Sequence, residues 1–152
     1  MKLKIEIGEG LEKEVVLRAP AFDDDVRRIQ RAIEKASSSG GEIALKNSGG
    51  EIYVSYSEIC FFEANEDRVY AQTPSSCYVC PMRLSELEEL LPRAFCRASK
   101  SVLINTAKIR SLTRSPTGVG EAVFAGTEKT AFISRMYYKI VRETIEETRL
   151  SK

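Results

Sequence analysis

The amino-acid sequence predicts a mostly β protein with a few helices. Three observations support this fold class. Between Glu42 and Ser134 the chain is divided into short alternating or β-branched segments by turns rich in Gly, Asn and Asp. Only one stretch inside that span has a helical pattern, and the other helical patterns lie near the two chain ends.

Length and composition indicate one domain with an appendage. A chain of 152 residues can bury about two thirds of its unfolded surface. The hydrophobic content of 43% and charged content of 30% are ordinary for a globular protein. Apolar runs stay short of the ~20 residues that a membrane span needs. Met1 to Ile7 lacks the apolar segment of a secretory signal, so we expect a cytoplasmic protein.

The first elements are expected to form an appendage. Lys2 to Ile7 and Glu14 to Arg18 alternate apolar with charged residues around two glycines, which predicts a β-hairpin with one solvated face. A helix should follow, because acidic residues Asp23 to Asp25 precede apolar residues at the helical period. These apolar positions are Phe22, Val26, Ile29, Ile33 and Ala36. Ser37 to Gly41 reads as a linker, so we divide the chain into an appendage, residues 1–40, and a main body, residues 41–152.

The main body begins with strands predicted near residues 42–47, 51–55, 58–63, 68–73 and 76–80. A short helix should come next, with Ser85 as its N-cap, Glu88 as the capping-box partner and Pro92 as its terminator. Further strands are expected at residues 94–98, 102–112, 121–125 and 130–134. Ser134 should cap a last helix whose apolar stripe contains Met136, Ile140, Val141 and Ile145.

The net charge of +1 conceals a strongly cationic segment. Residues 91–120 hold six basic side chains and no acidic one: Arg93, Arg97, Lys100, Lys108, Arg110 and Arg114. Such a local positive field is the usual mark of a polyanion partner. A merely solvated basic face explains the charges equally well, so charge alone leaves the choice open.

Catalytic and metal chemistry find little support in the sequence. The chain contains no histidine, which excludes Ser/His, Cys/His and other histidine-based catalysis. Cys77 and Cys80 have the CxxC spacing, but in a strand residues i and i+3 point to opposite faces, and no second ligand pair completes a zinc site. We therefore expect neither an enzyme, a metal site nor a cofactor, and we expect reduced thiols.

Four ordered segments give the chain a family resemblance. "EICFFEA", the helix "LSELEELL", "AFCRASKSVLINTAKIRSL" and "AFISRMYYKI" follow one another between roughly Gly41 and Val141. Together they resemble the LytTR-type DNA-binding domain of bacterial response regulators. The resemblance implies elongated, small antiparallel β-sheets with one short helix. It also implies loops that enter successive major grooves at promoter direct repeats and bend the DNA.

Carried over by position, the family's contact regions fall on three polar loops of this chain. The first contains Asp67 and Arg68, of which we prefer Arg68 because a carboxylate repels phosphate. The second falls on Ser99, Lys100 and Ser101, although the family commonly has histidine where this chain has Ser99. The third falls on Arg135. With Arg97, the candidate DNA-binding residues are Arg68, Arg97, Ser99, Lys100, Ser101 and Arg135.

Structural roles compete with binding at several positions. Arg97 could instead form an ion pair with Glu63, and Asn105 could simply satisfy the backbone of a turn. Six aromatic residues are most simply core: Phe61, Phe62, Tyr70, Phe95, Phe124 and Phe132.

The predicted function is a sequence-specific, non-enzymatic transcription regulator that binds double-stranded promoter DNA. Forty residues cannot build a receiver domain, so we expect a stand-alone form without a phosphorylation switch. Stand-alone relatives resemble regulators controlled by a cognate membrane inhibitor protein. The N-terminal appendage or the helix 135–150 should then form homodimer or partner contacts, because each offers an amphipathic surface. Contact with RNA polymerase is a further expectation. The alternative is a β-rich protein-interaction adaptor whose basic surface docks an acidic protein and has no DNA role.

Overall fold

The computed structural model describes residues 2–37 and 41–150, and it confirms a mostly antiparallel β fold with three helices. The larger sheet has the order β2-β1-β5-β4-β3-β7-β6. Its strands are β1 (Glu42–Asn47), β2 (Gly50–Ser55), β3 (Phe61–Asn65), β4 (Arg68–Gln72), β5 (Cys77–Cys80), β6 (Phe95–Ser99) and β7 (Val102–Asn105). The smaller sheet, β10-β9-β8, contains β8 (Ile109–Arg114), β9 (Gly120–Phe124) and β10 (Thr130–Ile133). The helices are α1 (Asp24–Ser37), α2 (Leu84–Leu90) and α3 (Arg135–Leu150).

Two adjacent phenylalanines of β3 belong to two different hydrophobic cores. Phe62 is fully buried in the core that includes α2, and its ring lies 6.0 Å from that of Phe95. Phe61 belongs to the second core and stacks on Phe124 of the smaller sheet at 5.4 Å. Because successive strand residues face opposite sides, the pair connects the α2 side of the molecule to the α3 side.

The predicted strand 102–112 is in fact two strands in different sheets. β7 ends at Asn105, and the 3₁₀-turn η2 (Thr106–Lys108) redirects the chain into β8. The Asn105 amide oxygen accepts a hydrogen bond from the backbone N–H of Ala107 at 3.1 Å, which caps this turn. The apolar pattern runs on through the turn, so it did not mark the break. A second 3₁₀-turn, η1 (Tyr56–Glu58), likewise moves the start of the third strand to Phe61.

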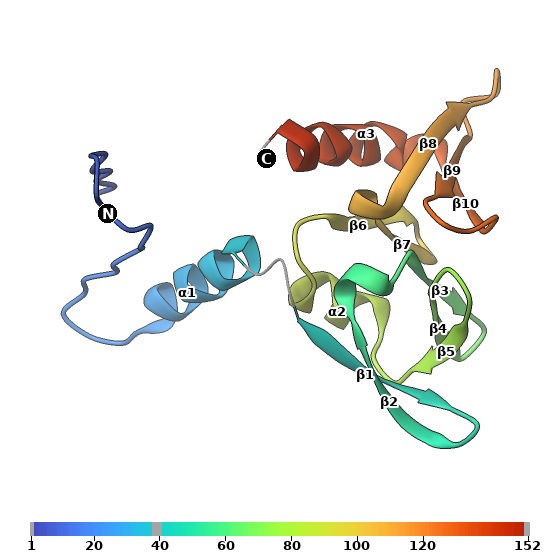
Figure 1. The fold of residues 1–152 in the computed structure, drawn as a ribbon, viewed down its shortest axis with the longest axis horizontal. Coiled ribbons are helices and arrows are strands. Elements are labelled where there is room, and N and C mark those ends of the chain that lie inside the picture. The colour runs from blue at the N-terminus through green and yellow to red at the C-terminus, as the bar shows by residue number, and fades with distance from the viewer. Residues whose placement is uncertain (1, 38–40, 151–152) are drawn as a thin grey trace.

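The predicted N-terminal hairpin is not formed. Residues 2–20 contain no strand, although helix α1 follows as expected and Asp23 accepts a hydrogen bond from the Val26 N–H at 2.9 Å. Apolar side chains of this segment are exposed, including Ile7 at 94% and Leu3 at 89%. A two-stranded hairpin without a surface to pack on is marginal in water, which explains why alternation alone did not produce strands. Figure 1 shows this segment and α1 extending from the sheets.

Helix α2 begins two residues earlier than expected. Its N-cap is Arg83, and the Glu86 carboxylate accepts a hydrogen bond from the Arg83 backbone N–H at 3.3 Å. Ser85 therefore lies inside the helix and is not its cap. Leu84 and Leu87 are buried, so the first turn that the Arg83–Glu86 capping box closes also contributes a core residue.

Helix α3 packs through a face that only partly overlaps the predicted one. Tyr138 and Val141 are buried with Ile145 partly buried, whereas Met136 is 76% exposed and Ile140 is 48% exposed. Tyr138 is therefore a core residue that the predicted stripe omitted. Phe132 is also exposed, at 65%, because the alternation in β10 turns Ala131 and Ile133 inward instead.

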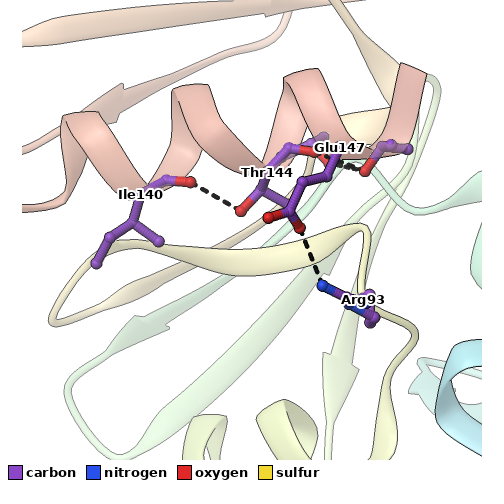
Figure 2. A network of polar contacts seen from close by, with 6 residues as sticks. Arg93, Ile140, Thr144 and Glu147 are labelled. Carbon is purple, nitrogen blue, oxygen red and sulfur yellow. Dashed lines mark hydrogen bonds and ion pairs between the residues drawn. The ribbon is translucent and has the colours of Figure 1, made fainter. Parts of the chain in front are cut away.

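Polar contacts join the C-terminal half of α3 to the segment before β6 and to the start of β8, and one lies within the helix itself. An ion pair joins Arg93, before β6, to Glu147 at 3.0 Å, and the Thr144 hydroxyl donates to the Ile140 carbonyl at 2.7 Å (Figure 2). The Arg149 guanidinium donates to the Ile109 carbonyl at 2.6 Å. Among the described residues, no helix is long and apolar enough to cross a bilayer.

Candidate nucleic-acid interface

Three of the predicted contact segments lie next to one another. The backbone N–H of Ala64, at the end of β3, donates to the Ser101 carbonyl in the β6–β7 turn at 2.8 Å. The N–H of Ser134, just before α3, donates to the Ala98 carbonyl in β6 at 2.9 Å. These two bonds connect the β3–β4 turn, the β6–β7 turn and the start of α3 into one edge, which we call the three-turn edge.

The β6–β7 turn holds Lys100 at its exposed tip. Inside the turn, the Ser101 N–H donates to the Ser99 hydroxyl at 3.2 Å, and the two hydroxyl oxygens lie 3.4 Å apart. The register shifts between Arg97 and Ser99, so this turn contains a β-bulge, a device that re-aims side chains. Ser99 and Ser101 thus shape the turn that presents the lysine.

Arg97 is engaged within the protein. Its guanidinium forms an ion pair with Glu88 of α2 and donates a hydrogen bond to the Lys100 carbonyl. The predicted alternative, an ion pair between Arg97 and Glu63, is wrong. Strand β7 lies between β3, which carries Glu63, and β6, which carries Arg97. Arg97 also pairs with Leu103, which pairs with Phe62, so Arg97 lies on the face of the sheet opposite to Glu63. The described geometry therefore makes Arg97 a positioning residue for the Lys100 turn.

The β3–β4 turn carries mixed charge. Asn65 and Arg68 pair at its base, and Glu66 with Asp67 form its tip. Glu66 adopts a φ of 57°, a left-handed conformation that is uncommon for a residue other than glycine. All four of these side chains are exposed. Two carboxylates at the tip would repel phosphate, so Arg68 on the flank is better placed for an anion than Asp67.

Arg135 is the first residue of α3 and is exposed. The first turn of this helix contains no acidic residue, so the partial positive charge of the helix start is not offset there. Sequence reasoning did not identify two residues beside it, Arg114 and Gly118, which lie in and just after β8. In the sequence, Arg114 stood out only as a member of the cationic segment, residues 91–120, and Gly118 only as a glycine at a bend.

Asn105 has a structural role, as the simpler interpretation predicted. It is 3% exposed, and its amide donates to the carbonyl of Ile59 at 2.9 Å and to that of Tyr56 at 3.4 Å. Together with its bond from Ala107, these contacts connect η1 and η2 and fix the base of the β6–β7 hairpin.

The cysteines do not form a ligand set. Cys77 is exposed and Cys80 is buried, which confirms that the CxxC pair points to opposite faces. Burial raises the pKa of the Cys60 and Cys80 thiols, and burial raises that of Cys96 to about 11. Within the described ranges, no group of three or more His, Cys, Asp or Glu side chains could hold a metal ion.

A second basic surface lies between β8 and α3. An open groove of about 330 Å³ is lined by Arg110, Arg142, Arg149 and Glu146 over an apolar floor that includes Leu112 and Tyr138. Arg142 is paired with Glu146 at 3.6 Å, and Arg149 is bonded to the Ile109 carbonyl. Much of this positive charge is therefore occupied by internal contacts, in contrast to that of Lys100 and Arg135.

The fold is a mostly β protein whose three-turn edge carries exposed cationic side chains. Among known protein families, the LytTr DNA-binding domain family matches residues 49–146. The chain belongs to the LytTR family, which comprises DNA-binding regulators and not enzymes. Its structure is similar to a LytTr DNA-binding domain from Bacillus cereus, with a TM-score of 0.63 and 22% identity over 68% of this chain and 95% of that one.

Relatives of similar length are found in Staphylococcus aureus. Proteins of strains NCTC 8325 and MRSA252, both named as uncharacterized HTH-type transcriptional regulators, are 29% and 28% identical over 147 residues. The matches cover 95% of this chain and 98% of theirs. Their names refer to a helix-turn-helix, but strands separate the three helices in the described part of this chain, so no such motif forms there.

Proposed function

We propose that this protein is a sequence-specific transcription regulator that reads promoter direct repeats through loops placed in the major groove of DNA. Family membership supports DNA binding. The observation that carries the finer proposal is the three-turn edge, where two backbone hydrogen bonds hold the segments of Arg68, Lys100 and Arg135 together. A rigid edge with several cations can follow a duplex in one orientation.

The residues on this edge differ in what they can do. Lys100 and Arg135 are exposed, and neither has an ion-pair partner among the described residues. Lysine and arginine can each donate to guanine O6 and N7 in the major groove, and arginine can do so with both arms of its fork. Arg97 supports Lys100 by bonding its carbonyl. Ser99 and Ser101 retain hydroxyl groups that can add a contact to a base edge or phosphate.

Removal of either exposed cation should weaken DNA binding. Lys100→Ala should cost on the order of 1 to 3 kcal/mol for a selected site, with a smaller loss on a duplex of unrelated sequence, and Arg135→Ala should weaken binding to the selected site as well. The matched control is Lys46→Ala, an exposed lysine on β1, which β5 and β4 separate from β3. Binding is measured by fluorescence anisotropy at fixed salt concentration.

The selected site comes from sequencing the genomic fragments that the parent protein retains. Enrichment of a direct repeat is the expected result. A pool without enriched sequence would reject the regulator and favour the basic adaptor. If Lys100→Ala and Arg135→Ala both bound every probe as the parent does, then the site assignment would be wrong while DNA binding itself could stand.

A homodimer is proposed through the N-terminal appendage, residues 1–40. Its described residues 2–22 expose large apolar side chains at Leu3, Ile5, Ile7, Leu11, Val15, Val16, Leu17 and Phe22. Apolar side chains collected on one exposed segment are typical of an interaction surface. Sedimentation of the full chain over a range of concentrations tests this directly, because a chain that stays monomeric would exclude the dimer.

The cellular setting follows from the regulator role as a further proposal. We place the protein in the cytoplasm, where promoter DNA and RNA polymerase are accessible, and we propose control by a cognate membrane inhibitor protein. Deletion of a membrane-protein gene adjacent to the regulator gene should raise reporter output from the target promoter. Unchanged reporter output would reject the proposed membrane inhibitor and would leave the proposed DNA binding in place.

A further inference from the structure

The hairpin between β8 and β9 packs against the first residue of α3. A Cβ atom placed on Gly118 would lie 2.8 Å from Cδ and 2.9 Å from Cγ of Arg135. Gly118 also has a φ of +92°, where side chains are strained. A side chain at this position would be strained and would crowd Arg135, so glycine lets the hairpin tip lie beside the aliphatic stem of Arg135.

Arg114, the last residue of β8, approaches the same glycine from the other side. Its guanidinium carbon lies 4.5 Å from the ring centre of Tyr138, and its Nε donates to the Gly118 carbonyl at 3.4 Å. Its Nη2 lies 3.7 Å from the position that a Gly118 Cβ would take. A cation stacked on an aromatic face and bonded at Nε has a fixed orientation. The two terminal nitrogens stay available for another acceptor.

This arrangement concentrates positive charge. Both arginines are exposed, and within the described ranges neither forms an ion pair. Glu121 faces away, because it pairs across the strands with Thr113 while Arg114 pairs with Gly120 on the other face. The N-terminal end of α3 adds the positive end of a helix dipole. Two guanidinium groups beside a helix start without a carboxylate repel one another, and a bound anion would relieve that repulsion.

We propose that Arg114 and Arg135 form a clamp for one phosphate of the DNA backbone, with Gly118 as the residue that allows them to meet. Arginine forks match the geometry of phosphate oxygens. The clamp adjoins the three-turn edge, since Ser134 is bonded to Ala98 of β6. The inference rests on the proposed DNA-binding function. It adds a position-fixing contact at Arg114, which is independent of base sequence.

Arg114→Gln should therefore weaken binding equally for a selected duplex and for a duplex of unrelated sequence. Removal of one phosphate contact should make the slope of log affinity against log salt concentration shallower by about 0.9. Between about 50 and 200 mM salt, the variant should then lose about three- to fourfold less affinity than the parent does. Arg114→Lys, which retains the charge, should restore most of the slope. Fluorescence anisotropy with both duplexes gives these values.

Arg28→Gln is the matched control, because it removes the same charge from α1, where Arg28 is paired with Asp25 outside the family match. Its slope should equal that of the parent. If the parent binds DNA but Arg114→Gln keeps the full slope, the clamp is wrong and the proposed function stands. A loss confined to the selected duplex would make Arg114 a base reader and would also overturn the clamp. A parent that binds neither duplex would reject the proposed function itself.

Gly118→Ala tests the geometry without removing a charge. The added methyl must displace the Arg135 side chain, so affinity for both duplexes should fall while net charge is constant. Thermal unfolding shows whether the variant is folded. A folded Gly118→Ala protein with the affinity of the parent would contradict the close approach on which the clamp depends. The double variant Arg114→Gln/Arg135→Gln should lose less affinity than the product of the two single fold-losses, because both side chains bind the same phosphate.

Discussion

At the residue scale, buried polar side chains stabilise the fold, whereas exposed cations are available to bind a partner. Asn105 satisfies backbone groups inside the fold, whereas Lys100 lies at the tip of a turn with its ammonium exposed. Arg97 is intermediate, since it supports the Lys100 carbonyl from within. A cation in the sequence therefore predicts a binding residue only when the fold gives it no acidic partner, and Arg97 fails this condition because α2 brings Glu88 to it.

Asn105→Ala should destabilise the protein by about 2 to 3 kcal/mol, because several buried backbone groups would lose their partners. Urea denaturation measures the change. Asn65→Ala, at an exposed position of β3, should change stability by less than about 0.5 kcal/mol. Equal and small effects of both substitutions would show that the Asn105 contacts contribute little to the fold.

At the element scale, the sequence predicted the existence of most strands and helices better than their boundaries and faces. Turn residues and alternation located the β1–β2 and β3–β4 hairpins. At α3 the helical period predicts a stripe of Met136, Ile140, Val141 and Ile145, but the helix packs through Tyr138, Val141 and Ile145. Local pattern cannot tell which of two overlapping apolar faces a neighbouring sheet will cover.

The two faces of α3 provide a direct comparison. Val141→Ala leaves a cavity in the core beneath the helix and should cost about 2 kcal/mol of stability. Met136→Ala, at a side chain that is 76% exposed, should change stability by less than about 0.5 kcal/mol. Denaturant unfolding of both variants distinguishes the observed packing from the predicted stripe, which requires comparable losses.

At the scale of the whole molecule, the candidate site could be predicted only in part. Family signatures in the sequence indicated the segments of Arg68, Lys100 and Arg135, and the structure brings these segments to one edge. Arg114 could not be predicted to adjoin Arg135, because the approach depends on how the smaller sheet packs on α3 and on the space above Gly118. Contacts between distant parts of the chain are set by packing, which local sequence does not encode.

Deletion of residues 1–40 should leave the main body folded. β1 starts at Glu42 and pairs with β2 and β5, so every described strand lies outside the deleted segment. The thermal midpoint should stay within a few degrees of that of the full chain, while sedimentation should show loss of any self-association. A large drop in the midpoint would mean that the appendage belongs to the main body.

The neighbouring phenylalanines of β3 have a mechanical consequence. Because Phe61 and Phe62 insert into separate cores from a single strand, no flexible joint separates the sheet that carries Lys100 from the helix that begins at Arg135. The fold therefore fixes the spacing between the Lys100 turn and the start of α3 at Arg135. If the proposed function holds, DNA whose contact points do not match that spacing has to bend or unwind on binding. Stiff base steps between the contact points should then lower the affinity, although the protein does not touch them.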